Sequence, residues 1–257
     1  MTGFVTIFRR EIARFMKVIV QTVVTPFVSS FLYLLIFGVS LGGQMPSHQG
    51  VSYLAFLIPG LMMMGLINNS FQNSSSSIVS SKFSGDLEDL RVAPVTDHEI
   101  IWAMSLGAVV RGSIVAVITY LVGSFFMLYQ KGEWLTVVHP LTTLFFLIVA
   151  GLIFGMIGIS IAFWAKTFDQ LSAFSAFILL PLTYLGGVFL SIENLHPFWQ
   201  AVSKMNPLLY LINGLRYGIL GVSDVNVWTA AVISVLGFAF FYIAARFSLK
   251  KGSFQRW

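Results

Sequence analysis

The chain has 257 residues, of which 57% are hydrophobic and only 10% are charged, and it contains no cysteine. Soluble domains carry about a quarter charged residues, so this composition indicates a polytopic membrane protein, and the lack of cysteine excludes disulfides, thiolate metal sites and thiol nucleophiles. The net charge of +5 comes from basic residues beside apolar segments, which we interpret as topology signals and not as a nucleic-acid-binding surface.

Residues 1–17 predict an amphipathic helix at the cytoplasmic membrane interface, ahead of a transmembrane domain over residues 18–257. Apolar side chains recur at helical spacing, at Phe4, Phe8, Ile12, Phe15 and Ile19. The basic side chains expected on the opposite face are Arg9, Arg10, Arg14 and Lys17. A helix of this kind lies in the plane of the interface. The alternative is a simple cytoplasmic extension of the first span.

Six apolar segments are long enough to cross a hydrocarbon core about 30 Å thick, which requires about 20 helical residues. In chain order they are residues 18–41, 53–81, 100–129, 139–165, 170–190 and 228–245. Lipid cannot satisfy open backbone groups, and the runs lack the alternation of a membrane β-barrel, so the predicted fold class is an all-α polytopic membrane protein. Lys and Arg concentrate on the side that holds both termini, and the positive-inside rule therefore places both termini in the cytoplasm.

The second half of the second span is polar. Asn69, Gln72 and Asn73 are spaced to share one helix face. Amides that face lipid without hydrogen bonds are costly, so these side chains are expected to face other helices or water. They serve either interhelical hydrogen bonding, or protrusion into the cytoplasm, or the polar lining of a translocation pathway.

Acidic residues crowd into the loop between the second and third spans, at Asp86, Glu88, Asp89, Asp97 and Glu99. Acidic side chains at the start of a short helix suit its dipole, and Gly85 and Pro94 suit its boundaries. The segment over residues 85–95 is either a solvated loop or a short helix that docks into a cytoplasmic partner.

Motif searches point away from catalysis. The chain has no Gly-Lys dipeptide, and therefore no Walker A loop for ATP. Its four histidines lack metal-ligand spacing, and the G-x-S-x-G match at residues 38–42 ends a transmembrane helix instead of following a strand. We therefore predict no catalytic residue, no metal and no cofactor on this chain. The GxxxG element at Gly151 and Gly155 predicts close helix packing, with a dimer interface as the alternative.

The order of segments and three stretches of sequence resemble the ABC-2 type permeases, the membrane subunits of type V ABC exporters, and among them the bacterial YadH-type and drug-export permeases. The stretches are residues 86–95 (DLEDLRVAPV), 181–200 and 205–221, and the resemblance covers essentially the whole chain. The third stretch is the most specific, through Asn206-Pro207, Tyr210, Gly214 and Arg216.

This resemblance implies a homodimer in contact with membrane lipids that recruits two copies of a separate ABC ATP-binding subunit, which would hold ATP and Mg. It implies an ATPase-coupling helix made of Gly85, Asp86, Leu87, Glu88, Asp89, Leu90, Arg91, Val92, Ala93 and Pro94. It implies an external re-entrant helical hairpin over residues 191–221, between the fifth and sixth spans, with gate residues Asn206, Pro207, Tyr210, Asn213, Gly214, Arg216 and Tyr217. It places the pathway between the first, second and fifth spans, where Asn69, Gln72, Asn73, Tyr33, Phe37 and Tyr184 would line it.

The predicted function is that of a permease subunit of an ATP-driven exporter in the bacterial inner membrane. The 25 phenylalanines and 10 methionines suit an amphipathic, drug-like or lipid-like cargo. A polysaccharide or glycolipid is the alternative cargo, because aromatic rings could line its path. Alternatives of another class are an ATP-independent channel or scramblase and a non-transporting membrane scaffold.

Overall fold

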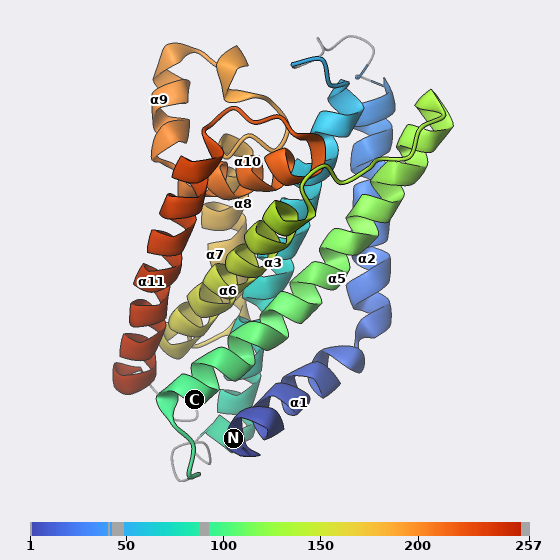
Figure 1. The fold of residues 1–257 in the computed structure, drawn as a ribbon. Coiled ribbons are helices and arrows are strands. Elements are labelled where there is room, and N and C mark those ends of the chain that lie inside the picture. Colours follow the sequence, from blue (N-terminus) through green and yellow to red (C-terminus); the bar gives the residue numbers. More distant parts are fainter. Residues whose placement is uncertain (1, 41, 43–48, 88–92, 253–257) are drawn as a thin grey trace.

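A computed structural model describes residues 2–40, 42, 49–87 and 93–252. Within these residues the chain is built from helices, and six helical segments are long and apolar enough to span a membrane: Ile19–Ser40, Tyr53–Ser84, Asp97–Lys131, Pro140–Trp164, Phe168–Leu185 and Val227–Lys251. The predicted all-α class with six spans is confirmed. The first residue of α1 and the last residue of α11 lie at the same end of the bundle, which we call the terminal end (Figure 1).

The chain begins with α1 (Thr2–Met16), which is separate from α2 (Ile19–Tyr33). Figure 1 shows that α1 runs obliquely beneath the bundle, whereas α2 runs along it. The segment is therefore a distinct helix and not an extension of the first span. After Tyr33 the first span continues as a π-helical stretch, η1 (Leu34–Ser40).

Three long helices form the centre of the bundle. They are α3 (Tyr53–Ser84), α5 (Asp97–Lys131) and α6 (Pro140–Trp164). In the most apolar 18-residue stretch of each helix, 78%, 61% and 61% of the residues are buried. The corresponding values are 22% for the first span, 17% for the fifth and 11% for the sixth. The outer spans thus present most of their surface to lipid or to another protein.

Local sequence explains where the central helices begin and end. α3 ends at Gly85, whose φ of 87° is a left-handed conformation that glycine adopts at little cost. α5 begins with a capping box in which Thr96 and Glu99 satisfy each other's backbone N–H groups. α6 begins at Pro140, which needs no hydrogen-bond donor in the first turn.

The GxxxG element of α6 packs inside the chain. An added Cβ at Gly151 would lie 2.9 Å from Val109 Cγ2, and one at Gly155 would lie 3.0 Å from Ala108 Cβ, both on α5. The predicted close helix packing is confirmed, and these glycines are not available to a second protomer.

The fifth span is broken into α7 (Phe168–Phe174), a π-helical stretch η2 (Ser175–Leu179) and α8 (Leu180–Leu185). The π-helical stretch precedes Pro181, which has no N–H to continue the hydrogen-bond ladder. The span ends at Leu185 and not at residue 190 as predicted, because Gly186 caps it and Gly187 turns the chain with a φ of 83°.

Between the last two spans lie a short 3-10 turn, η3 (Ile192–Asn194), and two helices, α9 (Pro197–Met205) and α10 (Pro207–Leu220), before α11 (Val227–Lys251) begins. Figure 1 shows α9 at the end opposite the terminal end, and α10 lying across the direction of the long helices. At 1.5 Å per residue α10 is about 21 Å long, which is too short to cross a bilayer. The predicted hairpin over residues 191–221 therefore contains two helical arms, and its insertion into the outer leaflet stays a prediction.

Candidate functional site

The helix α10 is held at its start by Asn206. The Asn206 Oδ1 accepts a hydrogen bond from the Leu208 N–H (3.0 Å), and its Nδ2 donates to the Leu182 carbonyl of α8 (2.6 Å). Pro207 occupies the first turn, where no donor is required. The predicted gate residues Asn206 and Pro207 thus join α10 to the end of the fifth span.

Arg216 is the largest fully buried side chain of the described residues. Its Nη1 donates to Asn213 Oδ1 (2.9 Å) and its Nη2 donates to the Gly187 carbonyl (2.7 Å). The guanidinium carbon lies 3.8 Å from the centroid of the Phe56 ring on α3, and Asp224 Oδ2 lies 4.0 Å from Nη1. Burial lowers the pKa of Arg216 to about 10, an effect that Asp224 opposes, so the side chain is cationic at neutral pH.

Asp224 connects the two loops around this arginine. It accepts hydrogen bonds from Ser191 Oγ (2.9 Å) and from the Ile192 N–H (3.1 Å), and its own N–H donates to Asn213 Oδ1 (3.1 Å). One polar network therefore ties the loop after α8 to α10 and to the loop before α11. The resemblance implied a role for Asn213 and Arg216 but not for Asp224, which has no motif around it.

The rest of α10 packs closely on α6. An added Cβ at Gly214 would meet the Phe146 ring at 2.2–2.5 Å, so only glycine fits at this position. The Tyr217 ring stacks on His139 with centroids 4.8 Å apart, and Tyr210 Oη donates to the Lys204 carbonyl (2.9 Å). All the predicted gate residues therefore belong to α10 and its N-cap.

The predicted aromatic lining residues come together at the same end of the bundle. Tyr33, Phe37 and Tyr184 surround Phe189, with ring centroids 5.8, 5.2 and 5.3 Å from it. Phe189 was absent from the predicted set. Its signal in the sequence is a phenylalanine two residues after the paired glycines, Gly186 and Gly187, that end the fifth span.

The structure separates the amides of α3. Asn69 lines a cavity of about 160 Å³ between α2, α3 and α5, and Gln72 lines another of about 250 Å³ between α3, α5 and α7. Asn73 is fully buried and belongs to neither cavity. Asn68, which precedes Asn69 and was absent from the predicted set, also lines the first cavity and accepts a hydrogen bond from Ser175 Oγ (3.1 Å).

Asn73 faces α1, where the predicted position of Arg14 is wrong, whereas Arg9 and Lys17 are exposed as predicted. Arg14 does not point away from the bundle, because its guanidinium donates to the Asn73 carbonyl (2.5 Å) and to Ser76 Oγ (3.0 Å). Glu11 is fully buried and accepts hydrogen bonds from Arg14 (3.1 Å) and Ser77 Oγ (2.6 Å). The polar half of α3 therefore attracts the charged side of α1, a preference that the helical period of α1 alone does not reveal.

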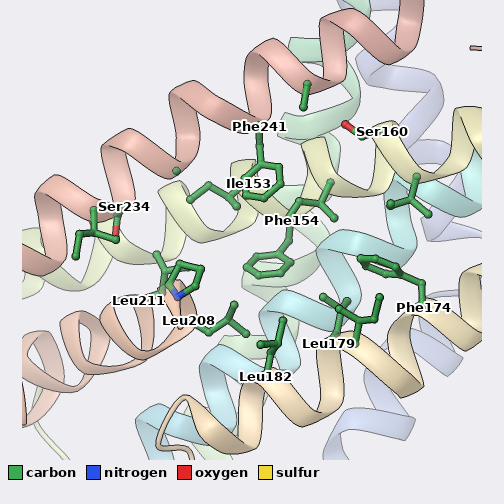
Figure 2. A pocket seen from close by; sticks show the side chains of 17 residues that line it. Ile153, Phe154, Ser160, Phe174, Leu179, Leu182, Leu208, Leu211, Ser234 and Phe241 are labelled. Carbon is green, nitrogen blue, oxygen red and sulfur yellow. The ribbon is translucent and has the colours of Figure 1, made fainter. Parts of the chain in front are cut away.

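A third cavity, of about 340 Å³, is enclosed by α6, the fifth span, α10 and α11. Figure 2 shows Phe154, Leu182, Leu208 and Phe241 converging on it from these elements. Its lining is almost entirely apolar, apart from Ser160 and Ser234. The space suits a hydrocarbon chain and no polar ligand.

The predicted coupling helix is described at its two ends. Glu88, Asp89, Leu90, Arg91 and Val92 lie outside the described residues. Gly85, Asp86 and Leu87 follow α3 at the terminal end, and Ala93 and Pro94 precede α5. Leu87 is only 2% exposed and packs in an apolar cluster with Ile7 of α1, whereas Asp86 is exposed.

The base of this loop is anchored to α6. Lys82 is buried, and its Nζ donates to the carbonyls of Ala162, Phe163 and Ala165 (2.8, 2.8 and 3.1 Å). Three of the open carbonyls at the end of α6 are thereby satisfied by one side chain. A displacement of the loop would act directly on α1, α3 and α6.

Comparison with known proteins places the chain in a family. The model of the ABC-2 type transporter family matches residues 2–220. The chain is 40% identical over 247 residues to the inner membrane transport permease YadH of Escherichia coli strain K12, covering 96% of this chain and 94% of that protein. It is 23% identical to nodulation protein J of Neorhizobium galegae, covering 93% of this chain and 90% of that protein. The chain therefore belongs to the ABC-2 type transporter family.

Proposed function

We propose that this protein is the permease subunit of an ATP-driven exporter in the bacterial inner membrane, with both termini in the cytoplasm. Two copies form the membrane part, and two copies of a separate ABC ATP-binding subunit bind at the terminal end and carry ATP and Mg. The observation that carries the proposal is the family match along the chain together with a sparsely covered face between α2 and α7 that leaves polar side chains open.

That face supports a dimer. Gln72 is exposed there, at the rim of a polar cavity between spans. On α11 the exposed side chains suit lipid, because the large apolar ones run along most of the helix and the exposed basic ones, Arg246, Lys250 and Lys251, lie at its terminal end. The exposed large apolar side chains are Trp228, Val232, Val235, Leu236, Phe240, Ile243 and Phe247. Polar groups in contact with lipid are unfavourable, so the face between α2 and α7 is the one that a second protomer or a water-filled path would cover.

The proposed cargo is amphipathic, drug-like or lipid-like, because polar side chains and aromatic rings occupy successive levels of this face. Asn69 and Gln72 lie on α3, and the rings around Phe189 lie toward the opposite end. The second candidate is a polysaccharide or glycolipid, which the aromatic cluster favours because planar rings stack on sugar faces. In either case α10 and the buried Arg216 network form the proposed external gate.

The coupling segment would transmit the ATPase motion. Leu87 and Lys82 connect the loop to α1, α3 and α6, and the exposed acidic side chain of Asp86 offers a charged contact to the partner. Closure of the ATPase pair would shift a two-state arrangement of these helices. The permease itself performs no bond chemistry.

The test is charge reversal in the coupling segment, with Asp86, Glu88 and Asp89 all changed to lysine. The purified permease–ATPase pair in proteoliposomes is expected to lose cargo-stimulated ATP hydrolysis and to lose binding of the ATPase. The matched control is Glu133→Lys, an exposed acidic residue at the other end of the bundle, which should retain both.

Two results would contradict the proposal. One is unaltered ATPase stimulation in the triple variant. The other is uphill transport by the permease alone in liposomes, which a pump without its ATPase cannot perform; downhill transport without any ATPase would instead favour the channel or scramblase alternative.

A further inference from the structure

Arg111 is a charged residue to which the proposed mechanism gives no role. It lies in the middle of α5, within a membrane-spanning segment, and is only partly exposed. Its Nε is enclosed without a hydrogen-bond partner, and no carboxylate of the described residues forms an ion pair with it. An arginine in a span without a partner is costly, so it requires either a structural or a functional explanation.

The nearby acid is already engaged. Glu11, buried beneath α3, binds Arg14 and Ser77 through its two oxygens, and Arg10 also lies 3.5 Å from it. Arg14 reinforces the positive potential at Arg111 instead of neutralising it. Glu11 is therefore engaged by Arg10 and Arg14 and forms no ion pair with Arg111.

Arg111 lines the cavity of about 250 Å³ between α3, α5 and α7. Its wall carries serine hydroxyls and one amide, from Gln72, Ser75, Ser76, Ser172 and Ser175. Ser75, Ser76 and Ser175 donate their hydroxyl hydrogens to groups of the protein. The side chains of Gln72 and Ser172 make no such bond within the described residues, so the cavity offers unused donors from three different helices.

The depth of the cavity fits a charged head group. Ser172 and Ser175 stand about 6 and 11 Å along the helix from Phe168, the first residue of the fifth span at the terminal end. With the termini in the cytoplasm, this is the inner-leaflet side, just beneath the polar layer of the bilayer. A head group could reach the guanidinium while its chain remained in lipid.

We infer that this cavity is a phosphate-recognition site, in which Arg111, Gln72 and Ser172 bind the phosphate of an amphipathic molecule from the cytoplasmic leaflet. Arginine offers a planar fork of donors that matches phosphate oxygens, and the amide and hydroxyl complete a set of hydrogen-bond donors. The identification of this molecule as the cargo rests on the proposed function, but the binding itself does not.

The experiment measures binding to the purified protein in detergent by native mass spectrometry, without ATPase or turnover. The probes are phosphatidic acid and diacylglycerol, which differ only by the phosphate, and inorganic phosphate serves as a competitor. The wild type should bind phosphatidic acid in preference to diacylglycerol, and Arg111→Gln should weaken phosphatidic acid binding at least about tenfold, the size of one charge-assisted contact. Arg111→Lys should retain part of the affinity.

Two controls separate the site from general effects of charge or folding. Arg9→Gln removes an exposed cation from α1 and should leave binding unchanged. Arg111→Gln should have an unchanged or raised melting temperature, because it removes a cation without a partner, whereas a structural arginine would lower it.

Each outcome has a defined meaning. If millimolar inorganic phosphate competes with phosphatidic acid, the site is supported and a soluble phosphate group is sufficient for binding. If phosphatidic acid binds and inorganic phosphate does not compete, the site is supported and its ligand is a phospholipid. Equal phosphatidic acid binding by Arg111→Gln and wild type, or an equal loss in Arg9→Gln, would overturn the proposal. The coupling-segment triple variant should bind phosphatidic acid normally, which distinguishes failure of the site from failure of the transport proposal.

Discussion

Replacing Arg216 with alanine tests the central claim about the external gate, because this side chain holds α10, the loop after α8 and α3 together. The substitution removes two hydrogen bonds from a charged donor, at 2.9 and 2.7 Å, each with a value of about 1.5–3 kcal/mol. It also removes the contact with the Phe56 ring and leaves Asp224 buried beside a vacated site. The recovered cost of burying the arginine offsets part of this sum, so we expect a net loss of about 3–5 kcal/mol.

The assay is thermal unfolding of the purified protein in detergent. For a chain of this size roughly 2–4 °C corresponds to 1 kcal/mol, so the melting temperature should fall by roughly 6–20 °C. The combined variant Arg216→Met with Asp224→Asn removes both charges and should recover part of the loss, because the Asp224→Asn change removes the buried negative charge that the lost guanidinium would have offset. We expect Arg216→Ala to impair export in proteoliposomes while the ATPase still binds at the other end of the molecule. A melting temperature within 2 °C of wild type (about 1 kcal/mol), or a double variant less stable than the single one, would refute this account.

Two further predictions concern packing and assembly. Gly214→Ala should destabilise the protein by about 1–3 kcal/mol, because the new methyl group meets the Phe146 ring at 2.2 Å. Gly237→Ala on α11, whose nearest neighbour lies at 3.7 Å, should be neutral or stabilising by up to about 1 kcal/mol. Thermal unfolding compares the two variants, and equal shifts in melting temperature would show that contact with Phe146 is not the cause. The chain has no cysteine, so single cysteines report protomer contacts directly: in native membranes, a bis-maleimide should cross-link Val24→Cys or Phe177→Cys, on exposed positions of α2 and η2, but not Phe240→Cys on the lipid-facing side of α11. Cross-linking of Phe240→Cys alone would place the dimer interface on α11 and would contradict the proposed interface between α2 and α7.

Several elements were predicted well because their signals are local. The boundaries of α3 and α6 agree with their apolar runs to within a few residues, since proline, glycine and caps act on the neighbouring backbone. The predicted fifth span ended five residues too late. Residues 186–190 are as apolar as the residues of the span, but Gly186 and Gly187 end the helix and turn the chain. Hydropathy measures affinity for lipid and does not register a backbone turn.

Sites were predicted less completely, for a different reason. Helical spacing grouped Asn69, Gln72 and Asn73, yet the packing of α1 on α3 buries Asn73 and leaves Gln72 in a cavity. Arg14 was assigned to the outer face of α1 because the period of an isolated helix cannot register the polar surface of a neighbour. The coupling segment could be predicted only through resemblance. Its Glu88–Val92 portion lies outside the described residues and stays a prediction.

The sequence by itself determined that this is a helical membrane protein with six spans, because an apolar run of some twenty residues is stable across the hydrocarbon core. The pair of helices before the last span was implied by the resemblance and not by the apolar runs. Only the tertiary structure decided which polar groups meet. Asp224 reaches Arg216, Glu11 reaches Ser77, and Arg111 remains without an ion-pair partner among the described residues. These outcomes depend on how each helix is rotated against its neighbours, a property of long-range packing that no local pattern contains.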